Sequence, residues 1–329
     1  MYFIRLIISQ IKNISITRIA KNDIFLLTLR YGILKAYSDK MIITIISFME
    51  GIVMQIRILG SGGGEGFPAP FCSCEHCEDA RKKGGKSLIT LSQSIIDNTL
   101  LIDLPSDTNA HCLRFKINLG QIQNILITHS HPDHYVPDLL ATRRDLCAHN
   151  MKYKNLYIYG PSDLKALFNR ANISETIREN IHFIDLKAGE KVKIGEYDVT
   201  PIDALHAPTL GSLNYIIEKD GKSLLYLIDS GYPTKATLEF LKGMNKVFDA
   251  VVMDGTMGTS EPLTYLYHMG YEENKQLKQE LIQKGIADTC TRFVVTHITH
   301  NKSEYHEKVE EIFKGTGISV AYDGFETEI

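Results

Sequence analysis

The chain has 329 residues, of which 44% are hydrophobic and 23% charged, and its formal net charge is −3. This composition is ordinary for a globular protein that can bury a core, and it gives no sign of a basic nucleic-acid-binding surface. Six cysteines in a chain of this length, three of them clustered, exclude a small disulfide scaffold and favour a metal site. The other three, Cys112, Cys147 and Cys290, stand alone among apolar residues, so we expect unpaired thiols in the core.

Residues 1–53 differ from the rest because they are rich in isoleucine and carry seven Lys/Arg against three Asp/Glu, a local charge of +4. Residues 54–329 then carry −3 − 4 = −7, so this part is acidic. The longest uncharged run before Met54, residues 41–49, is far shorter than the ~20 residues of a membrane span. No cleavage site of a signal peptide follows it, so we expect a cytoplasmic protein that does not enter a membrane.

Met54 resembles a natural domain start, because it opens a strand-like run that leads into a glycine-rich turn. We therefore predict that residues 1–53 are an extra N-terminal segment, either disordered or read from a misassigned start. A membrane-surface amphipathic arm is the alternative. Residues 54–329 are predicted to form one hydrolase domain, as no internal repeat or low-complexity linker divides them.

From Met54 onward, apolar strand-like runs alternate with helical patterns. The predicted strands are 55–59, 99–104, 124–129, 156–159, 197–202, 213–217, 224–229, 250–254, 292–297 and 318–322. The predicted helices are 139–147, 162–169, 235–242, 273–284 and 303–313. A hairpin turn is expected at Lys219-Asp220-Gly221. Hairpins mixed with helical crossovers indicate an α/β protein of two stacked sheets with helices outside, an αββα sandwich.

Four side chains of metal-ligand type follow one predicted strand in the stretch ILITHSHPDHY. In an extended segment His129 and His131 point the same way, so both imidazoles can face one ion. Pro132 favours an extended residue before it and a turn after it, which would carry Asp133 and His134 toward a second ion. Four such residues within six positions predict a metal site.

Further metal ligands are expected at the ends of other strands. His206 follows VTPIDAL, Asp229 ends LLYLID and His297 ends RFVVT. Loops at one edge of a sandwich can bring side chains from separate strands to one point. A carboxylate such as that of Asp229 is suited to bridging two cations, since it has two oxygens and a negative charge.

These motifs resemble those of the metallo-β-lactamase-fold hydrolases, whose His-x-His-x-Asp-His signature matches residues 129–134. The resemblance implies one divalent ion held by His129, His131 and His206. It implies a second ion held by Asp133, His134 and His297, with Asp229 between the two ions. It also implies that Asp103 supports the ligand loop without binding metal. Zinc or manganese is expected in this site, with iron as the alternative.

The stretch GSGGGEGFPAPFCSCEHC resembles the start of the phosphoribosyl cyclic phosphate phosphodiesterases of phosphonate breakdown. It is also similar to the start of the B proteins of pyrroloquinoline quinone biosynthesis. The phosphodiesterase resemblance implies a structural Cys₃His zinc site. Its residues here would be Cys72, Cys74, Cys77 and His300. In the alternative, His76 or no histidine completes the set.

The resemblance implies a phosphodiesterase that opens a small cyclic phosphate or cleaves a phosphodiester by two-metal chemistry. Asp133 and Asp229 would orient the nucleophile, and His268 would act as the acid near the substrate phosphate, unless it only caps the following helix. The alternatives are a hydrolase of a lactone, a thioester or the 3′ end of transfer RNA, and a quinone-cofactor biosynthesis protein. A small-molecule phosphate ester is the expected partner, the acidic charge disfavours nucleic acid, and a homodimer stays open.

Overall fold

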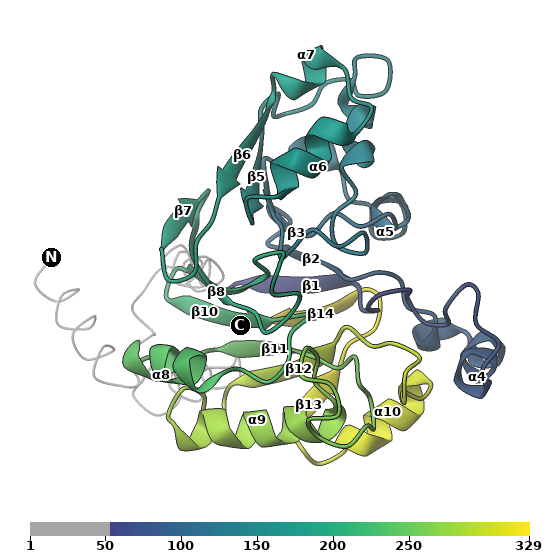
Figure 1. Cartoon of the computed structure of the whole chain (residues 1–329), viewed down its shortest axis with the longest axis vertical. Coiled ribbons are helices and arrows are strands. Elements are labelled where there is room, and N and C mark those ends of the chain that lie inside the picture. The colour runs from purple at the N-terminus through teal and green to yellow at the C-terminus, as the bar shows by residue number, and fades with distance from the viewer. Residues whose placement is uncertain (1–52) are drawn as a thin grey trace, which may run out of the picture. The chain divides into compact units, whose positions relative to one another are not determined.

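The computed structural model describes residues 53–329, and the expectations for residues 1–52 lie outside the described part. Two seven-stranded sheets run through this part (Figure 1). The first sheet has the order β14 (Phe325–Glu328), β1 (Gln55–Gly60), β2 (Gln93–Ile96), β3 (Leu100–Ile102), β4 (Asn124–Leu126), β5 (Leu156–Gly160), β6 (Ile181–Asp185). The second has the order β13 (Ile318–Val320), β12 (Arg292–Thr296), β11 (Ala250–Asp254), β10 (Lys222–Leu227), β9 (Leu213–Lys219), β8 (Tyr197–Asp203), β7 (Val192–Ile194).

The alternation of side chains along the strands places one apolar layer between the sheets and one on each outer face. On β3, Leu100 and Ile102 belong to the core shared with the second sheet, whereas Leu101 belongs to the outer core of the first. On β12, Val294 points inward, and Phe293 and Val295 pack outward. Successive residues of a strand point to opposite faces, so a sheet buried on both sides reads as a continuous apolar run.

Helices cover the two outer faces, which confirms the predicted αββα sandwich (Figure 1). The helices that pack on the first sheet are α5 (Thr108–Phe115), α6 (Leu164–Arg170) and α7 (Glu175–Arg178). Those on the second are α8 (Lys235–Gly243), α9 (Tyr271–Gln283) and α10 (His306–Phe313). Helix α4 (Glu75–Lys83) follows the glycine-rich turn, and short 3₁₀ segments lie at Gly85–Ser87, Leu119–Gln121 and Pro137–Arg143. Within residues 53–329, no helix has the length and apolar character to cross a bilayer.

Strand direction decides where functional loops gather. Strands β3 to β6 are parallel to one another, and so are β10 to β13. Strand β2 is antiparallel to both β1 and β3, and β9 is antiparallel to both β8 and β10. Strand β1 therefore runs in the same direction as β3, and β8 in the same direction as β10. In such sheets ligands bind beyond the carboxyl ends of the strands. The loops after β1, β3, β4, β8, β10, β11 and β12 therefore share one edge of the sandwich.

Several predicted elements have different bounds in the structure. The helix expected over 139–147 is a 3₁₀ segment, Pro137–Arg143, in which only Leu140 is buried, so no apolar face stabilises a longer helix. The polar helix α4 and the short or half-exposed strands β2, β6, β7 and β14 lack a strong apolar pattern and were not predicted. Nor were α5 and α7.

The prediction that all three isolated cysteines lie in the core is wrong for two of them. Cys147 and Cys290 are exposed, and Cys112 is partly buried. The thiol of Cys147 lies in a turn, where its sulfur accepts a hydrogen bond from Arg144 Nε at 3.2 Å. The backbone N–H of Cys290 donates to the Asp288 carboxylate at 2.7 Å in another turn. Both residues occupy connections between elements, and such connections lie on the surface. All three thiols are free.

Candidate metal centre

The loop after β4 carries the His-x-His-x-Asp-His stretch into the open edge of the sandwich. Beyond Pro132 the chain forms a tight turn, in which the N–H groups of His134 and Tyr135 donate to the carbonyl of His131 at 2.9 and 2.8 Å. The turn brings His134 back beside His129, with their ring centroids 4.3 Å apart. The local sequence therefore presents four metal-ligand side chains toward one region.

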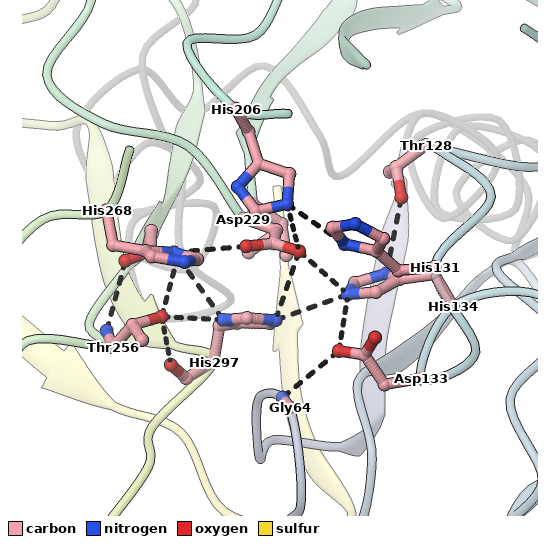
Figure 2. A network of polar contacts seen from close by, with 12 residues as sticks. Gly64, Thr128, His131, Asp133, His134, His206, Asp229, Thr256, His268 and His297 are labelled. Carbon is pink, nitrogen blue, oxygen red and sulfur yellow. Dashed lines mark hydrogen bonds and ion pairs between the residues drawn. The ribbon is translucent and has the colours of Figure 1, made fainter. Parts of the chain in front are cut away.

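The first group of metal-ligand side chains contains His129, His131, His206 and Asp229, of which the last three are labelled in Figure 2. The Nδ1 atom of His131 lies 2.9 Å from His129 Nε2 and 3.1 Å from His206 Nε2. The Oδ2 atom of Asp229 lies 3.1 Å from His129 Nε2. One atom of each side chain thus faces a common point.

The second group contains Asp133, His134, Asp229 and His297. The Nε2 atom of His134 lies 3.2 Å from His297 Nε2 and 3.3 Å from Asp133 Oδ2. It is also 3.2 Å from Asp229 Oδ2, the same oxygen that faces the first group. Figure 2 shows Asp229 in the middle of the rings of His131, His134, His206 and His297. Asp229 is therefore the one carboxylate common to both groups.

The rings of His134 and His297 also contact polar groups outside the two ligand groups, through the nitrogen that does not face the other ligands. Asp103 Oδ2 lies 2.8 Å from His134 Nδ1, and the other oxygen of Asp103 accepts the Thr128 N–H at 2.8 Å. On the opposite side, His297 Nδ1 lies 2.7 Å from Thr256 Oγ1 and 3.2 Å from Asp254 Oδ2. Such outer hydrogen bonds set the tautomer and direction of a ligating imidazole. Asp103 supports the loop from outside the two groups, in the place that the sequence resemblance implies.

Three of these residues have a left-handed backbone, which non-glycine residues rarely adopt. The φ angles are 66° at Asp103, 51° at Asp229 and 59° at His297. Each residue comes directly after a parallel strand or one residue beyond it. The left-handed turn redirects the chain at the strand end, and backbone strain of this kind is common at functional sites.

Electrostatics favours the ligand form for His129, His206, Asp229 and Asp133. His134 differs, because burial opposes its charge but Asp103 and Asp133 outweigh burial and raise its pKa. Burial lowers the pKa of His129, and it lowers the pKa of His206 to about 4, so both rings are neutral at pH 7. Burial alone would raise the pKa of Asp229, but the nearby histidines, His297 and His129 foremost, hold it well below its usual range. For Asp133, burial also acts upward, and His134 outweighs it, so the pKa falls. Neutral imidazole and ionised carboxylate are the forms that bind a metal.

The donor set fits divalent ions by geometry. Two nitrogens bound to one tetrahedral zinc lie about 3.3 Å apart, as follows from Zn–N bonds of about 2.0–2.1 Å. The nitrogen pairs of the two groups lie 2.9, 3.1 and 3.2 Å apart, close to that value. Imidazole nitrogen together with carboxylate oxygen suits zinc, iron and manganese. The residues present therefore fit two divalent ions that share Asp229.

His268 lies at the rim of this cluster, on the irregular stretch that precedes α9. Its Nδ1 atom is 3.0 Å from Asp229 Oδ1 and 3.3 Å from Asp254 Oδ2. Burial opposes its charged form, but Asp254 and Asp229 outweigh this effect and raise the pKa of His268 to about 10. The ring of the half-exposed Tyr265 stacks on it, with centroids 5.5 Å apart. Its Nε2 atom makes no hydrogen bond within residues 53–329.

The cysteine cluster forms a separate group around His300, which comes from the loop after β12. The Nδ1 atom of His300 lies 3.5 Å from Cys72 Sγ and 3.6 Å from Cys74 Sγ. With Zn–S near about 2.3 Å and Zn–N near about 2.0 Å, a tetrahedral S···N edge is about 3.5 Å. Cys77 supplies the third sulfur from α4. His76 is not in the group, and its Nδ1 atom faces Glu304 at 3.7 Å.

Cys74→Ser should release one zinc ion per chain and lower the midpoint of thermal unfolding, because a structural zinc contributes folding free energy. Zinc stoichiometry by mass spectrometry and a melting curve would measure both effects. Cys147→Ser is the matched control, since Cys147 is a free, exposed thiol. A Cys74→Ser protein that holds as much zinc as the control would contradict a zinc site here.

Sequence reasoning missed Asp254, Thr256 and Thr128, which contact the ligand side chains from outside. Asp254 had a readable signal, because AVVMD ends on a carboxylate in the same way as LLYLID ends on Asp229. The two threonines had none, since a hydroxyl beside a strand end is common in any sandwich. The structure brings together every sequence-predicted ligand, in the three groups described above.

Comparisons with known proteins agree with this arrangement. The family model described as "Beta-lactamase superfamily domain" matches residues 100–298, more than half of the chain. A curated relative, Ribonuclease BN of Erwinia tasmaniensis, is 26% identical over 158 residues, 46% of this chain and 46% of that protein. The matched part thus spans about half the length of that relative.

Two solved structures share the fold. A diphosphatase from the PhnP family has a TM-score of 0.65 at 20% identity, covering 84% of this chain and 98% of the other. Zn²⁺-bound PqqB from Methylobacterium extorquens has a TM-score of 0.60 at 17% identity, covering 84% of this chain and 100% of the other. Likenesses at this level of identity show the fold alone. From the family match and the sandwich together, the chain belongs to the β-lactamase superfamily and has the metallo-β-lactamase fold of metal-dependent hydrolases.

Proposed function

We propose that this protein is a dinuclear metal-dependent phosphodiesterase that opens a small cyclic phosphate or cleaves a small phosphodiester. The observation that carries the proposal is the position of Asp229 Oδ2, which lies 3.1 Å from His129 Nε2 and 3.2 Å from His134 Nε2. One carboxylate oxygen between two imidazole groups is an arrangement that suits a pair of divalent ions. The proposed active-site ions are zinc or manganese, with iron as the alternative.

Two such ions, when bound, supply a hydroxide nucleophile at neutral pH and neutralise the charge that builds on phosphate oxygens. Two side chains of the protein would orient the nucleophile. Asp133 accepts a hydrogen bond from the Gly64 N–H at 3.0 Å, and Asp229 lies 3.0–3.2 Å from nitrogens of His129, His134 and His268. As hydrogen-bond acceptors, the two carboxylates would direct the proton of the nucleophile away from the phosphorus atom.

His268 is proposed as the acid that protonates the leaving oxygen. Its Nδ1 atom faces Asp229 and Asp254, which stabilise a protonated ring, and Nε2 would carry the transferred proton. A ring charged in the resting site can donate that proton once the leaving oxygen develops negative charge. The stacked Tyr265 shields one face of the ring.

The names of similar proteins support phosphate chemistry. A diphosphatase and a ribonuclease both act on phosphoric ester or anhydride bonds, and both are among the similar proteins. The charge of −7 over residues 54–329 favours a small phosphate over a polynucleotide, since binding a nucleic acid requires a basic surface.

The test is to purify the full chain under metal-neutral conditions, measure its metals, and assay several ester classes side by side. We expect two active-site ions and one zinc per chain, with turnover of bis(4-nitrophenyl) phosphate and of a cyclic ribose phosphate. Turnover of lactones or thioesters alone would contradict the phosphodiesterase assignment.

Processing of the transfer RNA 3′ end is the second candidate, and the match to Ribonuclease BN favours it. A precursor transfer RNA belongs in the same assay. If it were cleaved far faster than the small diesters, the RNA assignment would replace the first. Iron content with oxygen-dependent turnover would instead point to quinone-cofactor biosynthesis.

A further inference from the structure

The glycine-rich loop Ser61–Gly66 follows β1 and contacts both metal-ligand clusters through two adjacent residues. At one end, the backbone N–H of Gly64 donates to Asp133 Oδ2 at 3.0 Å (Figure 2). At the other end, Glu65 Oε1 lies 2.7 Å from His300 Nε2. The same short loop therefore contacts one predicted ligand of the dinuclear site and one of the cysteine cluster.

The contact with Glu65 fixes which nitrogen of the His300 ring faces the cysteine sulfurs. Nδ1 faces the sulfurs of Cys72 and Cys74, and Nε2 points the opposite way, toward Glu65. A nitrogen binds zinc only through its lone pair, so the ring proton must lie on Nε2, where it can donate to the carboxylate. Carboxylate–histidine–zinc arrangements of this kind fix the ring and raise the basicity of the ligating nitrogen.

The part of the loop before Gly64 is packed closely against a metal ligand. A Cβ atom on Gly63 would lie 2.5 Å from the His297 ring, so only glycine fits there. Its N–H donates to Ile298 O at 3.1 Å, next to His297 in the chain. Upstream, Ser61 donates from its N–H and its hydroxyl to the buried Asp323. A displacement of Glu65 would therefore be passed to Gly64 and the Asp133 carboxylate.

We propose that Glu65 is a positioning residue that orients His300 in the Cys₃His site and, through the adjacent Gly64 N–H, holds Asp133 in the dinuclear site. This inference rests on the two metal sites of the proposed function but not on its substrate. It makes the cysteine cluster a support for the reactive centre as well as for the fold.

The experiment compares Glu65→Ala and Glu65→Gln with Glu326→Gln in the full-length protein. Glu326 is a matched control, because its side chain is 43% exposed against 39% for Glu65 and its carboxylate also faces a side-chain nitrogen, Arg57 Nε. Zinc release is followed with a chromogenic chelator. We expect Glu65→Ala to lose the cysteine-bound zinc at chelator concentrations about 10–100-fold lower than the control does. Glu65→Gln should recover part of this loss, since its amide oxygen still accepts a hydrogen bond.

A second measurement tests the connection to Asp133. We expect Glu65→Ala to need more added metal for half-maximal turnover of bis(4-nitrophenyl) phosphate, while the KM at saturating metal stays near that of the control. In the Co²⁺-loaded protein, the visible absorption of the cysteine site should also shift, because the ligand ring turns.

Zinc retention equal to that of Glu326→Gln would overturn the role of Glu65. An unchanged metal requirement together with easy zinc loss would overturn the connection to Asp133. If Cys74→Ser lost no zinc, the site itself would be refuted, and the role of Glu65 with it. Zinc retention does not depend on the substrate, so a failed phosphodiesterase assay would leave the first measurement valid.

Discussion

Asp229→Asn should reduce hydrolysis by at least about 10³-fold, because losing a ligand shared by two ions removes several kcal/mol of transition-state stabilisation. Asn is the informative replacement. It keeps the shape of the side chain and tolerates the left-handed backbone of Asp229, where φ is 51°. Asp229→Ala should abolish activity as well, but it adds backbone strain and a cavity.

The metal content should fall in parallel with the activity. Elemental analysis of Asp229→Asn is expected to show fewer active-site ions and an unchanged zinc at the cysteine cluster. Asp198→Asn is the control, because Asp198 is a half-exposed carboxylate that pairs with Lys191 and Lys193 away from the rings. An Asp229→Asn enzyme with full activity and the wild-type number of ions would contradict the dinuclear assignment.

His268→Ala should retain both active-site ions and lower turnover by on the order of 10²–10⁴, the usual contribution of general acid catalysis. The loss should depend on the substrate. An aryl diester with a nitrophenolate leaving group needs little protonation and should suffer less than an alkyl diester. His182→Ala serves as the control, since His182 is a histidine of β6 whose Nε2 atom contacts Asn155 at 3.2 Å.

The pattern of losses separates three roles for His268. Equal losses for alkyl and aryl diesters would show that it binds the phosphate rather than donating a proton. Loss of metal from the variant would show that it is itself a ligand, since it lies among Asp229, Asp254 and His297 in a group that could hold an ion. No loss at all would make it a bystander. The alternative that His268 caps α9 is wrong, because Gly270 is the N-cap of that helix and Glu273 completes the cap.

The dinuclear site could be predicted from the sequence because its residues follow a local rule. Four of them lie within six positions after one strand, and Asp229 and His297 follow strands that are buried along most of their length. A buried parallel strand reads as an apolar run, so a polar residue at its end stands out. The αββα arrangement could also be predicted from local signals, because hairpins and crossovers leave clear turn residues in the sequence.

Other features have no such signal. The helix α4 carries Cys77 and Ala80 into the core on an otherwise polar segment, EHCEDARKK, so its apolar face is only two residues wide. Glu65 looks like any charged residue in a glycine-rich loop, and only the fold brings it to His300, 235 positions further along the chain. Contacts between distant segments depend on packing, which the periodicity of a single segment does not encode.

The origin of the predicted active-site ligands in two different sheets has a consequence for folding. Residues 129–134 extend from the first sheet, whereas His206, Asp229 and His297 extend from the second. Ions held between them would cross-link the two sheets at this edge. At the opposite edge, the hydroxyls of Thr99 and Tyr197 form a hydrogen bond of 2.7 Å between the sheets. An ion at 100 times its Kd stabilises the folded state by about 2.7 kcal/mol. Metal supply would then set the lifetime of the folded chain in the cell as well as its turnover, because a chain short of metal opens more often to proteases.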